Sequence, residues 1–265
     1  MNLNVFIPLA FAVSSVIALV VFVSSPAVLW YLFGFFVVAA LFGSWSFCRQ
    51  AKNYFGWWQF ALLPIMVNIV TTVYLVIVAD RLVFYLFATL VAVFNYIYWR
   101  YLYFYLNNHS RYQSFSLEFL SFYLSFILVF LAAAALFGLK SFLELSSWLT
   151  LGSLAIFLML VIYQFAWISK YDNKESWLYL LAAWVFLVEL FAVLLYLPLN
   201  YNILGFVFAT GYYLLLVIIN DRLKNKLAAS VLSGFTETRS TIDAVRKVLY
   251  HNALGNDEKI EKLYQ

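Results

Sequence analysis

Glu189 is the residue that most directly suggests chemistry, because it places a carboxyl group in an otherwise apolar stretch at 177–199. An ionised carboxylate inside a bilayer is expensive unless it is paired or hydrated, and such residues often mark ion or proton pathways. One interpretation is a proton- or cation-binding group that faces the interior of a helix bundle. The other is a protonated glutamic acid that only hydrogen-bonds to a neighbouring helix. The sequence gives the two interpretations equal weight.

A short polar stripe surrounds Asn68, at the corresponding depth of the apolar stretch 57–79. Thr71 and Thr72 follow Asn68 at helical spacing, and Pro64 predicts a kink. These side chains either line a solute or ion site at mid-membrane, or they bond one helix to another, with each contact contributing about 0.6–2 kcal/mol. For Asn68 taken alone, the bonding role is favoured.

Two further polar residues complete the predicted site. Asn95 lies inside the apolar stretch 82–105, where helix bonding is again favoured, and Tyr196 lies two turns beyond Glu189 on the same helical face. The candidate intramembrane polar site therefore comprises Glu189, Asn68, Thr71, Thr72, Asn95 and Tyr196.

No catalytic or cofactor motif accompanies these residues. The sequence has no His-Glu-x-x-His, no paired-aspartate metal motif, no glycine-rich phosphate loop and no serine elbow. With two histidines and one cysteine, a multi-histidine or cysteine-based metal site is not expected. Polar residues gathered in the predicted cytoplasmic connections match no arrangement that a reaction requires. We therefore expect no cofactor and favour a non-enzymatic protein.

The elements that carry these residues are predicted to be membrane-spanning helices. The chain is 66% hydrophobic and 11% charged, whereas an average soluble domain is about a quarter charged. A spanning helix needs about 20 largely apolar residues. The sequence predicts an all-α integral membrane protein with eight spans, at 5–24, 27–47, 57–79, 82–105, 117–138, 147–169, 177–199 and 202–220.

The distribution of basic residues predicts the orientation of these spans. If the N-terminus is cytoplasmic, then of the 16 Lys and Arg residues only Arg81 and Lys140 fall in outer connections. An excess of Lys and Arg in short loops marks the cytoplasmic side. We therefore expect both termini in the cytoplasm and a multi-pass protein of the plasma membrane. The net charge of +4 follows from this placement and does not indicate nucleic-acid binding.

Weak internal similarity suggests a duplication. Val67-Asn68 matches Val188-Glu189, and Phe87-Ala88-Thr89 matches Phe208-Ala209-Thr210, both at an offset of 121 residues. A four-helix unit repeated twice keeps its orientation and would form a parallel repeat. The sequence thus predicts a first four-helix unit at 1–110, a second at 111–220, and a cytoplasmic helical tail at 221–265.

The tail contains an amphipathic segment that begins near Thr241. Mixed charges on its polar side favour docking to a protein partner over adsorption to lipid. The residues predicted to dock are Ile242, Val245, Val248 and Leu249.

Two functions from different classes remain open. The leading hypothesis is a non-enzymatic anchoring or assembly subunit of a membrane complex, which contacts membrane lipids and binds a protein partner or a second copy of itself. The alternative is a small membrane transporter or lipophilic-ligand-binding protein with a mid-membrane site around Glu189 and Asn68.

Overall fold

The computed structural model describes the helical part of the chain, at residues 3–24, 29–50, 56–78, 81–107, 116–169, 171 and 174–223. Every regular element in these residues is an α-helix. In chain order the helices are α1 (Leu3–Ser24), α2 (Leu29–Gln50), α3 (Trp57–Ile77), α4 (Arg81–Asn107), α5 (Ser116–Leu143), α6 (Ser147–Ile168), α7 (Lys174–Leu194) and a further helix, Tyr201–Leu223, which we call the final helix.

The prediction of a multi-pass membrane protein is confirmed at this level. Seven of the described helices, α2 to α7 and the final helix, are long and apolar enough to cross a bilayer. In α1, the segment Pro8–Val21 is apolar but shorter. Such helices satisfy their backbone hydrogen bonds internally, which is what hydrocarbon surroundings demand.

Two helices end at different places from those predicted. α5 continues through Gly138 to Leu143, and it ends where Glu144 adopts a positive φ of 50°. α7 ends at Leu194 instead of 199, because tight turns follow and Pro198 has no N–H to continue a helix. This shorter α7 brings Glu189 close to the helix end rather than to its centre.

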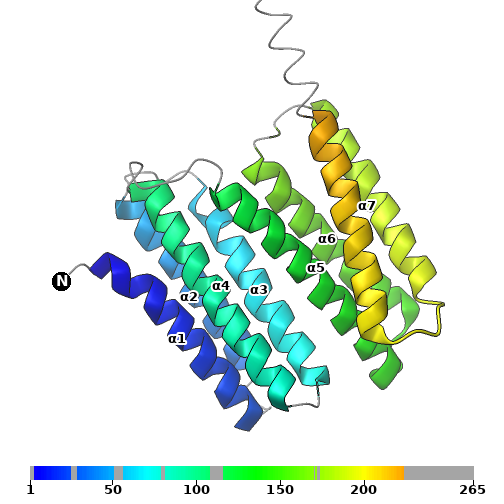
Figure 1. Ribbon diagram of the computed structural model, residues 1–265, viewed down its shortest axis with the longest axis horizontal. Coiled ribbons are helices and arrows are strands. Elements are labelled where there is room, and N and C mark those ends of the chain that lie inside the picture. The colour runs from blue at the N-terminus through cyan, green and yellow to red at the C-terminus, as the bar shows by residue number, and fades with distance from the viewer. Residues whose placement is uncertain are drawn as a thin grey trace, which may run out of the picture. The chain divides into compact units, whose positions relative to one another are not determined.

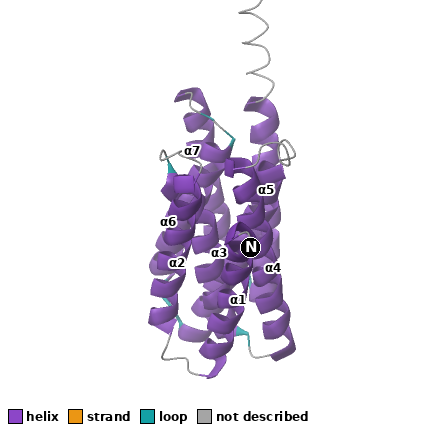
Figure 2. Ribbon diagram, turned by 90° about the vertical axis from the view of Figure 1, so that its left-hand side faces the viewer, coloured by secondary structure: helices purple, strands orange, loops and turns teal. Residues whose placement is uncertain are grey.

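The chain divides into two compact units, Met1–Leu216 and Val217–Gln265, and the contacts given below lie within the first. There the helices run alongside one another, as Figures 1 and 2 show. α1 packs on α4, α2 on α3, and α6 on α7, while α3 also contacts α4, α5 and α6. α3 and α5 therefore have neighbours on most sides, and each is 61% buried over its apolar span.

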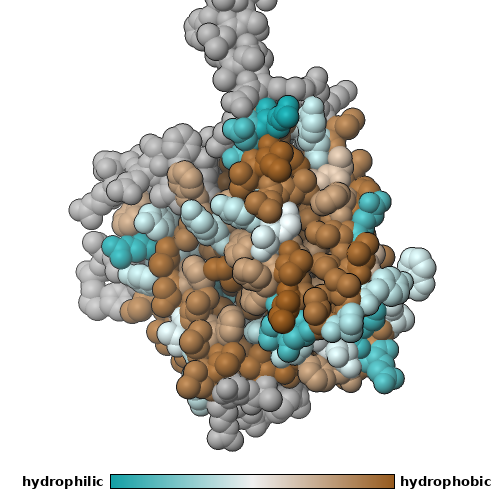
Figure 3. Space-filling model, turned by 45° about the vertical axis from the view of Figure 1, so that its right-hand side comes forward, coloured by the Kyte–Doolittle hydropathy of each residue, from teal (hydrophilic) through white to brown (hydrophobic). Residues whose placement is uncertain are grey.

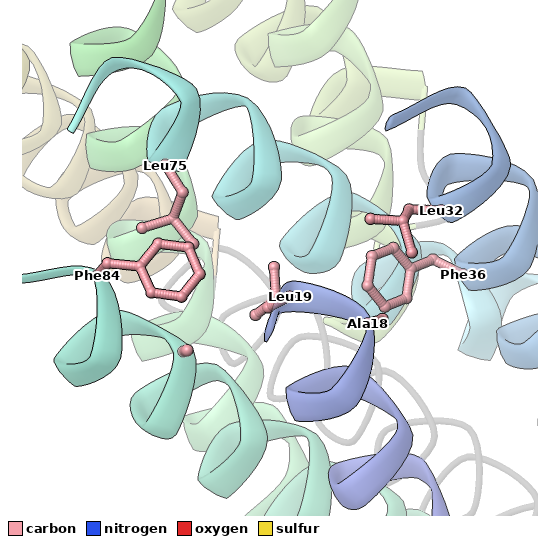
Figure 4. Packing of buried hydrophobic residues seen from close by; sticks show 7 residues of the cluster. Ala18, Leu19, Leu32, Phe36, Leu75 and Phe84 are labelled. Carbon is pink, nitrogen blue, oxygen red and sulfur yellow. The ribbon is translucent and has the colours of Figure 1, made fainter. Parts of the chain in front are cut away.

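A hydrophobic cluster joins the first four helices (Figure 4). Leu19 is 1% exposed, and the Phe36 and Phe84 rings pack from α2 and α4. A separate contact joins α1 to α4, where the ring of Phe11 stacks on Trp99 with centroids 4.6 Å apart. The cluster comprises Ala18, Leu19, Leu32, Phe36, Leu75, Phe84 and Ala88.

α5 and the final helix approach each other closely. A Cβ atom added at Gly205 would lie 2.8 Å from the Cβ of Ala134 and 2.9 Å from its backbone nitrogen. Small residues allow two helix backbones to approach in this way, which is how helices in membranes gain packing energy. Gly205 and Ala134 therefore fix the distance between these helices.

Candidate functional site

The structure joins two of the predicted site residues, Asn68 of α3 and Asn95 of α4, as a reciprocal amide pair. The Asn95 Nδ2 donates to Asn68 Oδ1 at 3.0 Å, and the Asn68 Nδ2 donates to Asn95 Oδ1 at 3.4 Å. Both side chains are buried, at 6% and 3% exposed. The pair ties two neighbouring helices together in the interior of the bundle.

The remaining amide hydrogens of this pair also have acceptors. Asn68 Nδ2 donates to the carbonyl of Pro64 at 2.8 Å, and Asn95 Nδ2 donates to the hydroxyl of Ser15 in α1 at 3.2 Å. The Ser15 hydroxyl in turn donates to the Phe11 carbonyl at 2.9 Å. Since each amide nitrogen has two hydrogens and two acceptors, the network leaves no donor free for a solute. The geometry of this network fits side chains that hold neighbouring helices together by hydrogen bonds.

Pro64 shapes the same region in a second way. A proline within a helix has no N–H for the carbonyl four residues earlier, which here is Phe60. The hydroxyl of Tyr98, from α4, donates to that carbonyl at 2.8 Å. Tyr98 thus satisfies the backbone group that Pro64 leaves unpaired, as membrane helices with internal prolines require. Sequence reasoning missed Tyr98 and Ser15, although the Pro64 spacing could have identified the open carbonyl.

The two threonines of the predicted site are fully buried on α3. The Thr72 hydroxyl donates to the carbonyl of Asn68 at 2.7 Å, within its own helix. The Thr71 hydroxyl has no hydrogen-bond partner among the described residues. Neither side chain carries a charge.

Glu189 and Tyr196 lie elsewhere, on the outer surface. Glu189 is exposed, and its neighbours Leu187 and Phe191 are both fully buried. Two residues along a helix correspond to about 200° of rotation, so Glu189 projects away from the face that packs on the bundle. Tyr196 is 80% exposed, in the turn after α7. The ammonium of Lys140 lies 5.8 Å from the centroid of its ring.

The structure therefore does not bring Glu189 to Asn68. α6 packs against both α3 and α7, whereas the Asn68 side chain points to α4 and α1. The two residues that match at the repeat offset also differ in burial, because Asn68 is buried and Glu189 is exposed. A single interior site that contains both residues is not formed in this arrangement.

An open groove of about 630 Å³ runs along the outer face of α4. The hydroxyl of Thr89 donates to the Tyr85 carbonyl at 2.8 Å, so the groove presents mainly apolar surface. Such a surface suits the acyl chains of membrane lipids. Its lining residues are Tyr85, Leu86, Thr89, Leu90, Val93 and Phe94.

Within the described part of the chain, no three His, Cys, Asp or Glu side chains come close enough to hold a metal ion. The predicted docking residues of the tail, Ile242, Val245, Val248 and Leu249, lie outside the described residues. The chain matches no protein-family model, no curated protein and no solved structure.

Proposed function

We propose that this protein is a non-enzymatic anchoring or assembly subunit of a membrane complex. The observation that carries the proposal is that the buried polar groups bond to one another, whereas a carboxyl group is exposed on the surface of the bundle. The buried amides of Asn68 and Asn95 are occupied with each other, whereas the carboxyl of Glu189 is presented on the surface without a partner among the described residues. A polar group that faces outward inside a span is suited to bind another protein.

The surface chemistry of the described helices supports the same proposal. The face in Figure 3 is largely hydrophobic, and many aromatic side chains stand on the surface, among them Trp30, Tyr31 and Trp148 at 76%, 79% and 84% exposed. Amphipathic aromatic rings are favoured where a membrane meets water, and they provide large contact areas at protein interfaces. Membrane lipids and a protein partner are the ligands that such a surface suits.

A duplicated architecture is part of the proposal, and the helix pairing supports it. α1 packs on α4 as α5 packs on the final helix, and α2 packs on α3 as α6 packs on α7. The matched residues Phe87 and Phe208 each contact a ring of the preceding helix, Tyr74 at 5.2 Å and Phe191 at 5.4 Å between centroids. We propose two parallel four-helix units at 1–110 and 111–220.

We also propose that α1 is an eighth span, that both termini are cytoplasmic and that the protein resides in the plasma membrane. The described basic residues support this orientation. Arg49 lies at the C-terminal end of α2, whereas Lys140 lies in the last turn of α5, at the opposite end of the antiparallel bundle. The larger number of basic residues falls in connections on the Arg49 side.

Affinity purification of the intact chain from its own membranes in a mild detergent tests the proposed function. We expect a different polypeptide to co-elute at a fixed ratio. Deletion of 221–265, which contains the predicted docking residues, should cause that polypeptide to be lost. A solitary chain that carries a stoichiometric small molecule would instead support the transporter or ligand-binding alternative.

A further inference from the structure

The outward face of α7 carries a regular row of side chains centred on Glu189. Ala182, Val185, Glu189 and Val193 follow one another at intervals of three or four residues, and all four are exposed. This spacing places them on one stripe, the pattern by which one helix packs along another. α7 is also the least buried of the seven apolar helices, at 28% of its apolar span.

Lipid is an unfavourable environment for the carboxyl group of Glu189, at the centre of this stripe. α7 has 21 residues, about 31 Å in length, which matches the hydrocarbon thickness of a bilayer. Glu189 precedes the last helical residue, Leu194, by about 7–8 Å along the axis. Glutamate is shorter than the lysine and arginine side chains that reach the interface from inside a span. A carboxyl group at this depth requires a donor or a cation beside it.

Among the described residues of the first unit, Glu189 forms no ion pair with a basic side chain. The Lys140 ammonium lies over the ring of Tyr196, and Arg100 is occupied with Tyr96, to whose hydroxyl it donates at 3.3 Å. In a dimer formed through the α7 stripe, the two copies would place one Glu189 against the other, where like charges repel. Charge complementarity therefore points to a different protein as the occupant.

We propose that the α7 stripe binds a transmembrane helix of another protein, which carries a lysine or arginine at the depth of Glu189. This inference rests on the proposed assembly function and names the partner's chemistry. The Glu189 carboxylate accepts a charge-assisted hydrogen bond from the partner's basic side chain, and Ala182 allows the two backbones to approach. The apolar residues of the stripe pack against the rest of the partner helix.

A synthetic helix tests this chemistry without the natural partner. The full chain is reconstituted in phosphatidylcholine vesicles together with a leucine-rich spanning peptide that carries a single lysine two turns from one end. Association is measured by energy transfer between labels on the two molecules. We expect the lysine peptide to bind at least about tenfold more tightly than the same peptide with leucine at that position, since a charged hydrogen bond contributes such a factor.

Two variants test whether Glu189 is responsible for the preference for the lysine peptide. Glu189→Leu should abolish the preference for the lysine peptide, and it should leave thermal stability unchanged because the side chain is on the surface. Glu144→Leu removes another exposed carboxyl, from the turn after α5, and should keep the preference.

Equal binding of the two peptides by the wild-type chain would overturn the inference, as would a preference that survives Glu189→Leu. Energy transfer between copies of the chain that is lost in Glu189→Leu would also overturn it, in favour of a homodimer. These results are independent of whether a natural protein co-purifies, so the inference and the proposed function can fail separately.

Discussion

At the scale of single residues, the interior polar groups act as connectors between helices. The amides of Asn68 and Asn95 satisfy each other, and Ser15 and Pro64 accept their remaining hydrogens. A buried amide that loses its partner keeps the full cost of its desolvation, whereas a complete pair contributes modestly. The network should therefore show strong coupling between its members.

We predict that Asn68→Leu and Asn95→Leu each destabilise the folded protein by about 1–3 kcal/mol, because each leaves one N–H and the carbonyl oxygen of the other buried amide unpaired. The double variant should lose less than the sum of the two, with a coupling energy of about 0.6–1.7 kcal/mol. Reversible unfolding in mixed detergent micelles measures all four states of the cycle.

Thr89→Val serves as the control for this cycle, because the Thr89 hydroxyl is exposed and bonds only within its own helix. It should change stability by less than about 0.5 kcal/mol. Additive effects of the two asparagine substitutions would contradict the pair.

The residue scale also shows what could be predicted from the sequence. Asn68, Asn95 and the two threonines could be identified as interior residues, because a polar side chain in an apolar helix favours the protein side over lipid. Their pairing could not, because it depends on the register of α3 against α4. By the same rule Glu189 is predicted to face inward or to bond to a neighbouring helix. It projects outward instead, because the buried residues Leu187 and Phe191 on either side of it turn the opposite face of α7 toward the bundle.

At the scale of elements, small residues decide how closely helices approach. Gly205 of the final helix lies against Ala134 of α5, and a methyl group added at Gly205 would meet backbone atoms of α5 within 3.0 Å. Gly152 of α6, in contrast, has no atom within 4 Å of the corresponding position. The two glycines therefore provide a matched pair of positions, one crowded and one open.

We predict that Gly205→Ala lowers stability by about 1–3 kcal/mol, because the added methyl group must separate two backbones. Gly152→Ala should be neutral or stabilise by up to about 1 kcal/mol, because alanine favours the helix and nothing obstructs it. Thermal unfolding of the two purified variants in the same detergent tests the difference. Equal effects at both positions would mean that α5 and the final helix do not approach as described.

The element scale was the most predictable from the sequence. Long apolar stretches located the helices to within a few residues, since the hydrocarbon thickness sets their length. The ends of α5 and α7 were harder to predict. After α7, for example, apolar residues such as Leu195 and Leu197 continue past the last helical turn. Hydropathy does not distinguish such a turn from a helix.

At the scale of the whole molecule, the proposed orientation assigns each helix end to one side of the membrane. The turn at 144–146 and the turn at 195–200 both follow helices that run in the same direction, α5 and α7. If the N-terminus is cytoplasmic and all eight helices span, both turns face the outside. Arg49 then faces the cytoplasm.

Cysteine labelling in intact cells tests this orientation. In a Cys48→Ser background, Ser146→Cys and Asn200→Cys should react with a membrane-impermeant maleimide. Arg49→Cys should react only after permeabilisation, and it provides the opposite-side control. The reverse pattern would place both termini outside and would contradict the positive-inside prediction.

The central claim is that the protein works as a subunit bound to a different protein, and the mass of the intact particle tests it most directly. Native mass spectrometry of the mildly solubilised protein should find the 30.7 kDa chain combined with another polypeptide in a fixed ratio. A particle of 30.7 kDa, or of an integral multiple of that mass, would contradict the claim and show that the chain acts alone or with its own copies.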